Sequence, residues 1–366
     1  MRANEPVTKT PNRGGWVSKF VLFVVSLAIF LEIAARLFLS VNPVRRRILG
    51  SDSSSYRLLW IGLHRLHLER TGPYGVYDPR RGWKVKPDIK SMSLWEGKTL
   101  NSNSKGLRGK TEYAYQRTAG KHRILTLGDS FTFGEGVSDN ETYSHYLESA
   151  LPNTEVVNLG VPGYGHDQML LYLKEEGVKY HPDVVILGFT YLNIYRNLWN
   201  FFVYAKPEFK LASGRLELTN VPVPTPDHVL ALEPYRPKAL DLMVIVREKL
   251  WWSLGITDRE ARGLASLIFD QIVATTRGVG AVPVFVYAAV LDEIDDPSNS
   301  MTTREQFLDH YCHEQGIPCL FLRPRFREEI KRGTKLKTVA HWDAREHQIA
   351  AQEIKDFLLD KNLAHF

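Results

Sequence analysis

The sequence predicts an α/β protein in which helices cover a parallel β-sheet, preceded by one transmembrane helix. Five short apolar runs occur at residues 124–127, 155–159, 183–189, 282–287 and 317–322. Stretches with a helical period alternate with them at residues 141–150, 168–179, 258–276, 304–315 and 346–359. Alternation of this kind is typical of parallel strands joined by right-handed crossovers, with helices on both faces. The 366 residues, 44% apolar and 24% charged, are enough to build a sizeable core.

The amino-terminal region predicts a membrane anchor. Residues 1–15 are polar and contain Pro and Gly, as in a disordered tail, whereas residues 16–41 are mainly apolar. The stretch from Phe20 to Leu39 is long enough to cross a bilayer at about 1.5 Å per residue. A cleaved signal peptide and an interfacial helix are the alternatives. We expect an uncleaved anchor because the stretch lacks a convincing small-x-small cleavage site, and basic residues on both sides leave its orientation open.

Two charged residues stand inside the apolar stretch. Glu32 and Arg36 are four residues apart, so they share one face of the predicted helix. We expect them to pair near the membrane interface or to point into a helix partner.

The overall charge argues against a nucleic-acid partner. The net charge is +6 and the pI is near 9.1, but the basic residues are scattered and form no nucleic-acid motif. Acidic membrane lipid or an anionic polymer suits this charge better. No Cys/His cluster has zinc spacing, and we expect neither a metal nor another cofactor. The oligomeric state stays open.

The two cysteines flank a predicted turn. Cys312 and Cys319 lie on either side of His-Glu-Gln-Gly-Ile-Pro. A disulfide between a helix end and the next strand and two buried thiols are both compatible with this spacing. We expect free thiols.

Two further segments surround the predicted sheet. Residues 42–119 form a lead-in with turn-like patches, and we expect short strands there that pack on the main domain at residues 120–366 but contribute no chemistry. An insertion at about residues 196–255 begins with a hairpin signal around Ser213-Gly214 and continues through three prolines. We expect a loop-rich cap that overhangs the strand ends and shapes substrate choice.

The chemistry is predicted where the strands end. The first strand runs into Gly128-Asp129-Ser130, the second is followed by a glycine-rich turn that contains Gly163, and the third by Asn193. His341 stands just before the last helix. Acyl transfer from an ester needs a hydroxyl, a base and donors aimed at the oxyanion. These roles fall to Ser130 as nucleophile, His341 as base, and the Ser130 and Gly163 backbone N–H groups with the Asn193 amide as the oxyanion hole.

Three residues near these have supporting roles in this interpretation. Asp129 holds the turn through backbone hydrogen bonds and is not a base. Asp343 caps the last helix. His347, inside that helix, belongs to its surface or packing.

In these motifs the chain resembles the SGNH, or GDSL, hydrolase superfamily, of the membrane-anchored bacterial type. The first block matches at Gly128-Asp129-Ser130, the second at Gly163, the third at Asn193 and the fifth at His341. The resemblance covers roughly residues 120–360. It implies a flavodoxin-like three-layer α/β/α sandwich and a serine esterase or O-acyltransferase, often acting on acylated carbohydrate outside the cytoplasm.

Two positions depart from the family pattern. The family usually has an Asp two or three residues before the histidine, where this chain has Val339 and Thr338, and often an Asp after the third-block Asn, where it has Ile194. The missing carboxylate normally fixes the tautomer of the base. Three alternatives follow: another acid replaces it, with Asp343 the nearest candidate; a Ser-His dyad acts with a backbone carbonyl; or activity is lost.

The sequence therefore predicts a single-pass membrane protein whose catalytic domain is periplasmic or extracytoplasmic. Its expected activity is hydrolysis or transfer of acyl groups, chiefly acetyl, on an acylated small molecule or carbohydrate. The alternatives are a catalytically weak relative that binds acylated glycan or partner subunits, and a structural membrane protein with the same fold. The choice between hydrolysis and transfer depends on whether water or a sugar hydroxyl reaches the acyl-enzyme.

Overall fold

The computed structural model describes residues 13–41, 49–64, 73–294, 300–336 and 341–363. Most of the predicted polar tail lies outside these ranges, as do Thr338 and Val339, the positions before His341 where the family has an Asp.

The centre of the protein is a five-stranded parallel sheet in the order β11-β10-β7-β5-β6. Its strands are β5 (His122–Gly128), β6 (Thr154–Gly160), β7 (Val184–Phe189), β10 (Val282–Tyr287) and β11 (Cys319–Phe321). All five predicted strands are confirmed. Their apolar side chains are almost entirely buried, as expected for a sheet covered on both faces.

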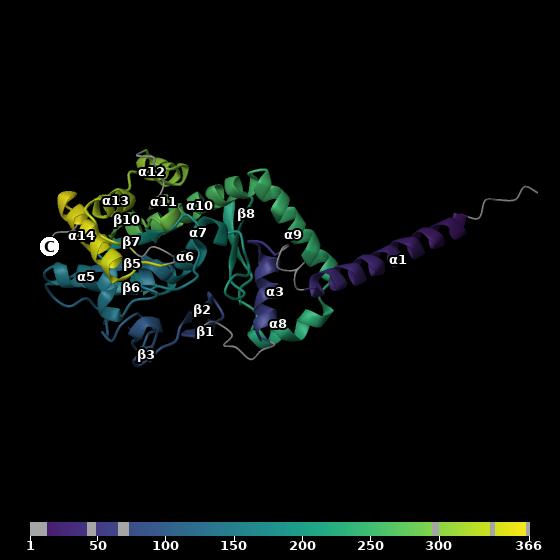
Figure 1. Cartoon of the computed structure of the whole chain (residues 1–366), viewed down its shortest axis with the longest axis horizontal. Coiled ribbons are helices and arrows are strands. Elements are labelled where there is room, and N and C mark those ends of the chain that lie inside the picture. Colours follow the sequence, from purple (N-terminus) through teal and green to yellow (C-terminus); the bar gives the residue numbers. More distant parts are fainter. Residues whose placement is uncertain (1–12, 42–48, 65–72, 295–299, 337–340, 364–366) are drawn as a thin grey trace, which may run out of the picture.

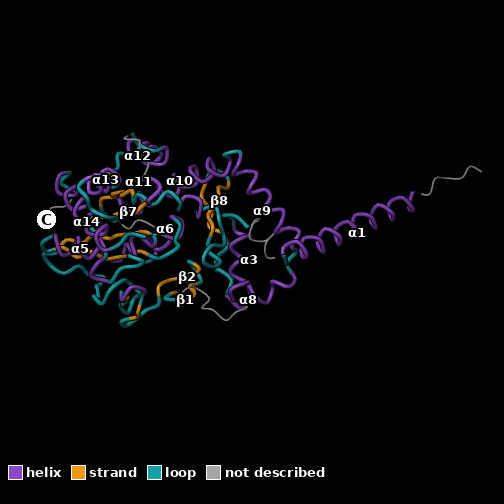
Figure 2. The backbone as a smooth tube through the Cα atoms, viewed as in Figure 1, coloured by secondary structure: helices purple, strands orange, loops and turns teal. Residues whose placement is uncertain are grey.

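Helices form a layer on each face of this sheet (Figures 1 and 2). One layer contains α5 (Tyr143–Ala150), α13 (Arg323–Lys331) and α14 (Ala344–Asp360), and the other α6 (His166–Glu175), α10 (Ile256–Gly278) and α12 (Thr303–Gln315). Helix α14 packs against α5, and α10 packs against α6. The predicted three-layer α/β/α sandwich is thus confirmed, with α13 as a helix that the sequence did not indicate.

Short helical segments join these elements. They are α4 (Ser130–Phe133), η2 (Asp139–Glu141), η3 (Gly177–Tyr180), α7 (Asn193–Arg196) and α11 (Leu291–Ile294).

The lead-in packs on the α/β domain, as predicted. It contains α3 (Ser53–His64), β1 (Gly75–Asp78), β2 (Gly82–Val85), β3 (Met92–Ser93), η1 (Trp95–Gly97) and β4 (Thr99–Leu100). The Trp83 indole donates to the Pro162 carbonyl at 2.9 Å, and the Tyr164 hydroxyl donates to the Trp83 carbonyl at 2.6 Å. These bonds fix the β1–β2 hairpin against the turn that follows β6.

The insertion differs from the loop-rich cap that the sequence predicted. The hairpin is confirmed as β8 (Glu208–Ala212) and β9 (Arg215–Thr219). The remainder is helical, with α8 (Pro226–Leu232), η4 (Glu233–Tyr235) and α9 (Lys238–Ser253). The helical period of α9 is hard to see in the sequence because apolar residues from 242 to 246 follow one another without a break. Helix α9 packs against α1 and α3, at the end of the molecule from which α1 projects (Figure 1).

The amino-terminal helix, α1 (Arg13–Ser40), extends away from the rest of the protein (Figure 1). Residues 16–40 are long and apolar enough to cross a membrane, and only 6% of the most apolar window is buried. Arg36 pairs with Glu32 at 2.7 Å, and both oxygens of Glu32 accept from backbone N–H groups at the start of α9. Of the two expected arrangements, the structure shows the pair together with a contact to another helix, α9.

The expectation of free thiols is wrong, because Cys312 and Cys319 form a disulfide. Cys312 lies at the end of α12 and Cys319 begins β11. The chain reverses between them at Gly316, whose φ of 59° lies in the left-handed region. This reversal brings the two Cα atoms to 6.3 Å, within the range that a disulfide spans.

Candidate active site

Ser130 stands at the carboxyl end of β5, as the first residue of α4. Asp129 caps this helix by accepting a hydrogen bond from the Phe131 N–H at 3.0 Å. A side chain could not replace Gly128, because a Cβ there would lie 2.0 Å from Oγ1 of Thr132. The strand therefore turns sharply into the helix and leaves the serine at the edge of the sheet.

His341 reaches Ser130 across 211 positions of sequence. Its Nε2 lies 2.9 Å from the Ser130 hydroxyl oxygen. The imidazole is partly exposed and lies against the ring of Phe131, with the ring centroids 5.4 Å apart. The two residues predicted as nucleophile and base thus meet at hydrogen-bond distance.

Asp343 lies near His341 in sequence but has another role. Its carboxylate accepts from the backbone N–H groups of Arg345 and Glu346, which caps α14 as predicted. The described residues include no carboxylate in contact with Nδ1 of His341. Asp343 therefore does not supply the missing orienting group in this structure.

Glu135 is a site residue that the sequence did not indicate. Its Oε2 lies 3.5 Å from Nε2 of His341, and its Oε1 accepts a hydrogen bond from the Tyr74 hydroxyl at 2.5 Å. Burial, followed by the negative charge of Glu135, raises the pKa of Tyr74. Tyr74 therefore stays a hydrogen-bond donor and holds the carboxylate beside the imidazole.

Gly163 contributes its backbone to the same place. Its φ is +82°, in the left-handed region, and a Cβ there would lie 2.6 Å from a methyl group of Val203. Within the described chain, no group accepts a hydrogen bond from the N–H of Ser130 or of Gly163. Both N–H groups are thus available to a ligand at this edge of the sheet.

Asn193 occupies a different position from the one the sequence suggests. It is fully buried, and its Nδ2 donates to Oδ2 of Asp129 at 3.0 Å. Its Oδ1 has no hydrogen-bond partner among the described residues. Asn193 does not line the cavity at Ser130, so its amide supports Asp129 from behind the site.

Asp129 does more than hold the turn. Besides the Phe131 N–H, its carboxylate accepts from the Thr190 hydroxyl at 3.0 Å, the Asn193 amide and the Arg196 guanidinium at 3.3 Å. Asp129 thus ties the nucleophile turn to the segment after β7. All of these contacts are to donors on α4, on the segment after β7 and on α7.

A cavity of about 310 Å³ opens in front of the Ser130–His341 pair. Its walls come from the lead-in, the turn after β6 and the start of the insertion. The lead-in, for which no chemical role was expected, contributes Tyr74, Trp83 and Lys84 to the wall of this cavity. The insertion contributes Arg196 and Phe202.

Arg196 was also missed in the sequence. Its guanidinium bridges Asp129 and the Tyr164 carbonyl, at 3.3 Å and 3.0 Å, and lies over the ring of Phe202. The sequence did contain one signal for Arg196: it stands three residues after Asn193, about one helical turn further along α7. Among the described residues, no cluster of His, Cys, Asp and Glu is placed to hold a metal ion.

Comparison with known proteins gives structural matches alone. No protein-family model matches the chain, and no curated protein matches it. Among solved structures, an acetyl xylan esterase is 11% identical, with a TM-score of 0.40, over 64% of this chain and 98% of that one. A member of the lipolytic G-D-S-L family from Veillonella parvula is 13% identical, with a TM-score of 0.34, over 64% and 97%.

A psychrotrophic esterase from Pseudoalteromonas sp. is 10% identical, with a TM-score of 0.38, over 66% of this chain and 99% of that one. These three proteins are what the chain is similar to in structure.

Proposed function

We propose that this protein is a serine ester hydrolase or O-acyltransferase that forms an acyl-enzyme on Ser130. The observation that carries this proposal is the 2.9 Å contact between the Ser130 hydroxyl and Nε2 of His341, at the mouth of a cavity. A histidine at this distance can take the hydroxyl proton as the oxygen attacks an ester carbonyl. The resemblance in the Gly-Asp-Ser, Gly163 and His341 motifs supports the same reaction.

The reaction proceeds in two stages in this proposal. Ser130 attacks the acyl carbon while His341 takes its proton, and the N–H groups of Ser130 and Gly163 donate to the oxyanion. His341 then gives the proton to the departing alcohol. Water, or the hydroxyl of an acceptor, then attacks the acyl-serine while His341 takes its proton. The bond between the acyl carbon and the Ser130 oxygen breaks, and His341 returns the proton to Ser130.

The cavity supports a small substrate. A volume of about 310 Å³ is near the lower end for ligand sites and suits a short acyl group, such as acetyl, with a sugar-sized alcohol. We infer an acylated carbohydrate or similar small molecule as the substrate class. Whether the second stage uses water or a sugar hydroxyl depends on the acceptor that the cavity admits.

We also propose that α1 is an uncleaved membrane anchor. A helix of a soluble core would be buried, whereas the apolar window of α1 is almost fully exposed. Cleavage of a signal peptide would remove Glu32, which accepts from two N–H groups of α9. The disulfide supports an extracytoplasmic position for the α/β domain, because disulfides persist in oxidising compartments. Intact mass measurement of the protein extracted from membranes tests this proposal, and a chain that begins after Ser40 would contradict it.

A second candidate is a catalytically weak protein that binds an acylated glycan or a partner subunit. One observation favours it: Glu135 faces the same imidazole nitrogen as Ser130 and can compete for it. Release of acetate from p-nitrophenyl acetate by the full chain in detergent separates the two candidates. The enzyme proposal expects turnover that Ser130→Ala and His341→Ala abolish, and wild-type turnover equal to that of both variants would contradict it.

A further inference from the structure

Helix α9 exposes a row of apolar side chains. Leu240, Met243, Val246 and Leu250 are exposed to 54%, 66%, 57% and 54%. They are spaced by three or four residues, so they lie on one face of the helix. The opposite face contains Asp241 and Ile245, which are fully buried.

Further exposed apolar side chains lie in the segments around this row, and Trp252, on the other side of α9, packs against Tyr195. The eight exposed large hydrophobic side chains between residues 232 and 254 are Leu232, Tyr235, Leu240, Met243, Val246, Leu250, Trp252 and Leu254. Elsewhere beyond α1, the exposed hydrophobic residues in the described chain are isolated or occur in twos. A concentrated apolar surface of this kind marks a site of contact with a protein or a membrane.

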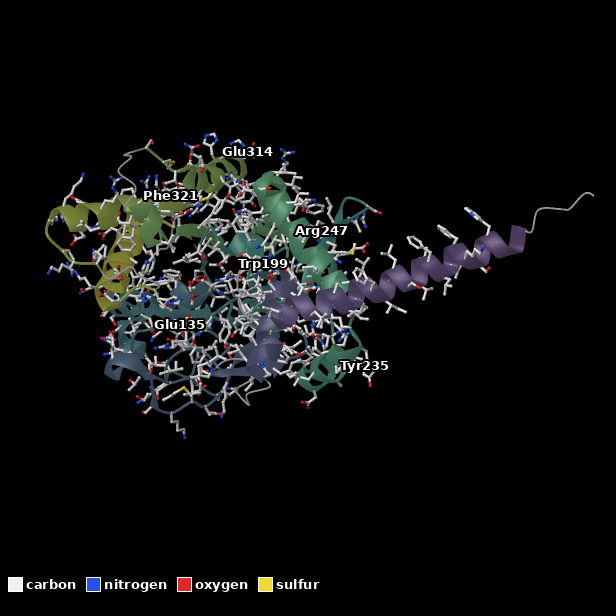
Figure 3. All side chains as sticks on the ribbon, turned by 45° about the vertical axis from the view of Figure 1, so that its right-hand side comes forward. Glu135, Trp199, Tyr235, Arg247, Glu314 and Phe321 are labelled. Atoms are coloured by element: carbon white, nitrogen blue, oxygen red, sulfur yellow. A yellow bond between two sulfur atoms is a disulfide. The ribbon has the colours of Figure 1, made fainter. Side chains whose placement is uncertain are left out.

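The position of α9 is fixed by α1. Besides the bonds from the α9 N-terminus to Glu32, the Arg36 guanidinium donates to the carbonyls of Pro234 and Arg236 at 3.4 Å. The segment just before α9 and its first turn are therefore held against the carboxyl-terminal part of α1. Figure 1 shows α9 running from this junction along the side of the body that faces α1, and Figure 3 places Tyr235 on that side.

We propose that this α9 face, defined by Leu240, Met243, Val246 and Leu250, rests on the surface of the phospholipid bilayer that α1 enters. The inference depends on the proposed anchoring role of α1. A helix held at the end of a membrane span lies at the level of the lipid headgroups, where an apolar row can enter the outer acyl region. Tyr235, 82% exposed just before α9, is of a residue type that favours this interface.

The charges near the face indicate whether electrostatic attraction or apolar burial drives the contact with the membrane. Arg247 pairs with Glu248 at 2.6 Å, and Lys238 pairs with Glu233. Cations that are already paired attract anionic lipid weakly. The contact is therefore mainly apolar and forms on uncharged phosphatidylcholine. Two attachments, through α1 and through α9, hold the α/β domain in one orientation on the membrane.

The test uses the full chain with single cysteines at Met243 and Leu250, labelled with the environment-sensitive dye NBD. The native cysteines are joined in a disulfide and do not take up the label. Control positions are Phe30 in α1 and Glu314 on α12, an exposed residue of the α/β domain labelled in Figure 3. Each protein is placed in phosphatidylcholine vesicles, and quenching by nitroxide lipid is compared with quenching by iodide. Circular dichroism confirms that each variant is folded.

The proposal expects nitroxide lipid to quench the labels at residues 243 and 250 several-fold more than the label at residue 314, with iodide showing the reverse order. Iodide quenching at 243 equal to that at 314, while lipid quenches the label at 30, would overturn it and leave the anchor standing. No lipid quenching at 30 would overturn the anchor and this inference together. Labels at 243 and 250 that are shielded from both quenchers and transfer energy between copies would show a protein partner instead.

Discussion

Glu135 and Ser130 face the same nitrogen of His341: Oε2 of Glu135 lies 3.5 Å from Nε2, and the Ser130 hydroxyl oxygen lies 2.9 Å from it. Serine hydrolases with a triad place the carboxylate at the other ring nitrogen, Nδ1, where it fixes the tautomer. Here the negative charge stands beside the nitrogen that receives the proton in the proposed reaction. It stabilises the imidazolium that forms when serine attacks, and in the resting state it competes with serine for Nε2.

The substitution Glu135→Gln should lower turnover of an acetyl ester by roughly ten- to hundredfold, with KM little changed. Two charges at this distance attract by a few kcal/mol at the effective dielectric of a partly exposed site, and the imidazolium exists only during the reaction. Steady-state kinetics at several pH values measure the effect, with Glu314→Gln as an exposed control. Higher turnover in Glu135→Gln would mean that the carboxylate withdraws His341 from Ser130 and keeps the site weak.

Asn193→Ala should act mainly on stability. Its amide donates to the buried carboxylate of Asp129, and loss of a donor to a buried charge costs about 1–3 kcal/mol. We expect the free energy of unfolding in urea to fall by this amount, with kcat reduced less than about tenfold. A drop in kcat of about 10² or more at unchanged stability would instead support the oxyanion role that the sequence suggested.

The protein should lose stability in mild acid because of two buried histidines. Burial, with smaller contributions from nearby positive charges, lowers the pKa of His166 and of His347 to about 3. The unfolded chain binds these protons near pH 6.5, and the folded chain binds them only near pH 3. The free energy of unfolding is therefore fully maintained above pH 6.5 and falls below it, by about 1.4 kcal/mol per pH unit for each histidine.

His347→Gln tests this prediction. The Gln oxygen can replace Nδ1 as the acceptor of the Tyr143 N–H bond, and it does not titrate. Urea unfolding between pH 7 and pH 4.5 should show a shallower loss of stability in this variant, whereas His310→Gln, at an exposed position, should match the wild type. Equal slopes in all three proteins would show that His347 is not held neutral by the fold.

The sheet and the reacting pair could be predicted from sequence for a physical reason. Parallel strands with buried faces appear as short apolar runs, and their carboxyl ends meet at one edge of the sheet. Ser130 and Gly163 follow such strands, so their proximity was expected from the strand ends. His341 was identified because it follows the last predicted strand and precedes the last helix.

The remaining site residues depend on tertiary contacts that have no local pattern. Tyr74 reaches the site because the lead-in folds back on the turn after β6, through the bond from Trp83 to Pro162. Glu135 lies in a glycine-rich turn, where a carboxylate is common and indicates no particular role. Only the fold brings it to His341. Asn193 is the reverse case: its position in the chain suggested the cavity, whereas in the structure its amide donates to Asp129.

The most direct test of the proposed chemistry is covalent capture of the nucleophile. The full chain in detergent is treated with a fluorophosphonate, which reacts with an activated serine, and the modified residue is located by peptide mass spectrometry. The account predicts one adduct, on Ser130, that is absent in Ser130→Ala and forms far more slowly in His341→Ala. A folded wild-type protein that takes up no label at Ser130, or that labels it equally fast without His341, would contradict the account.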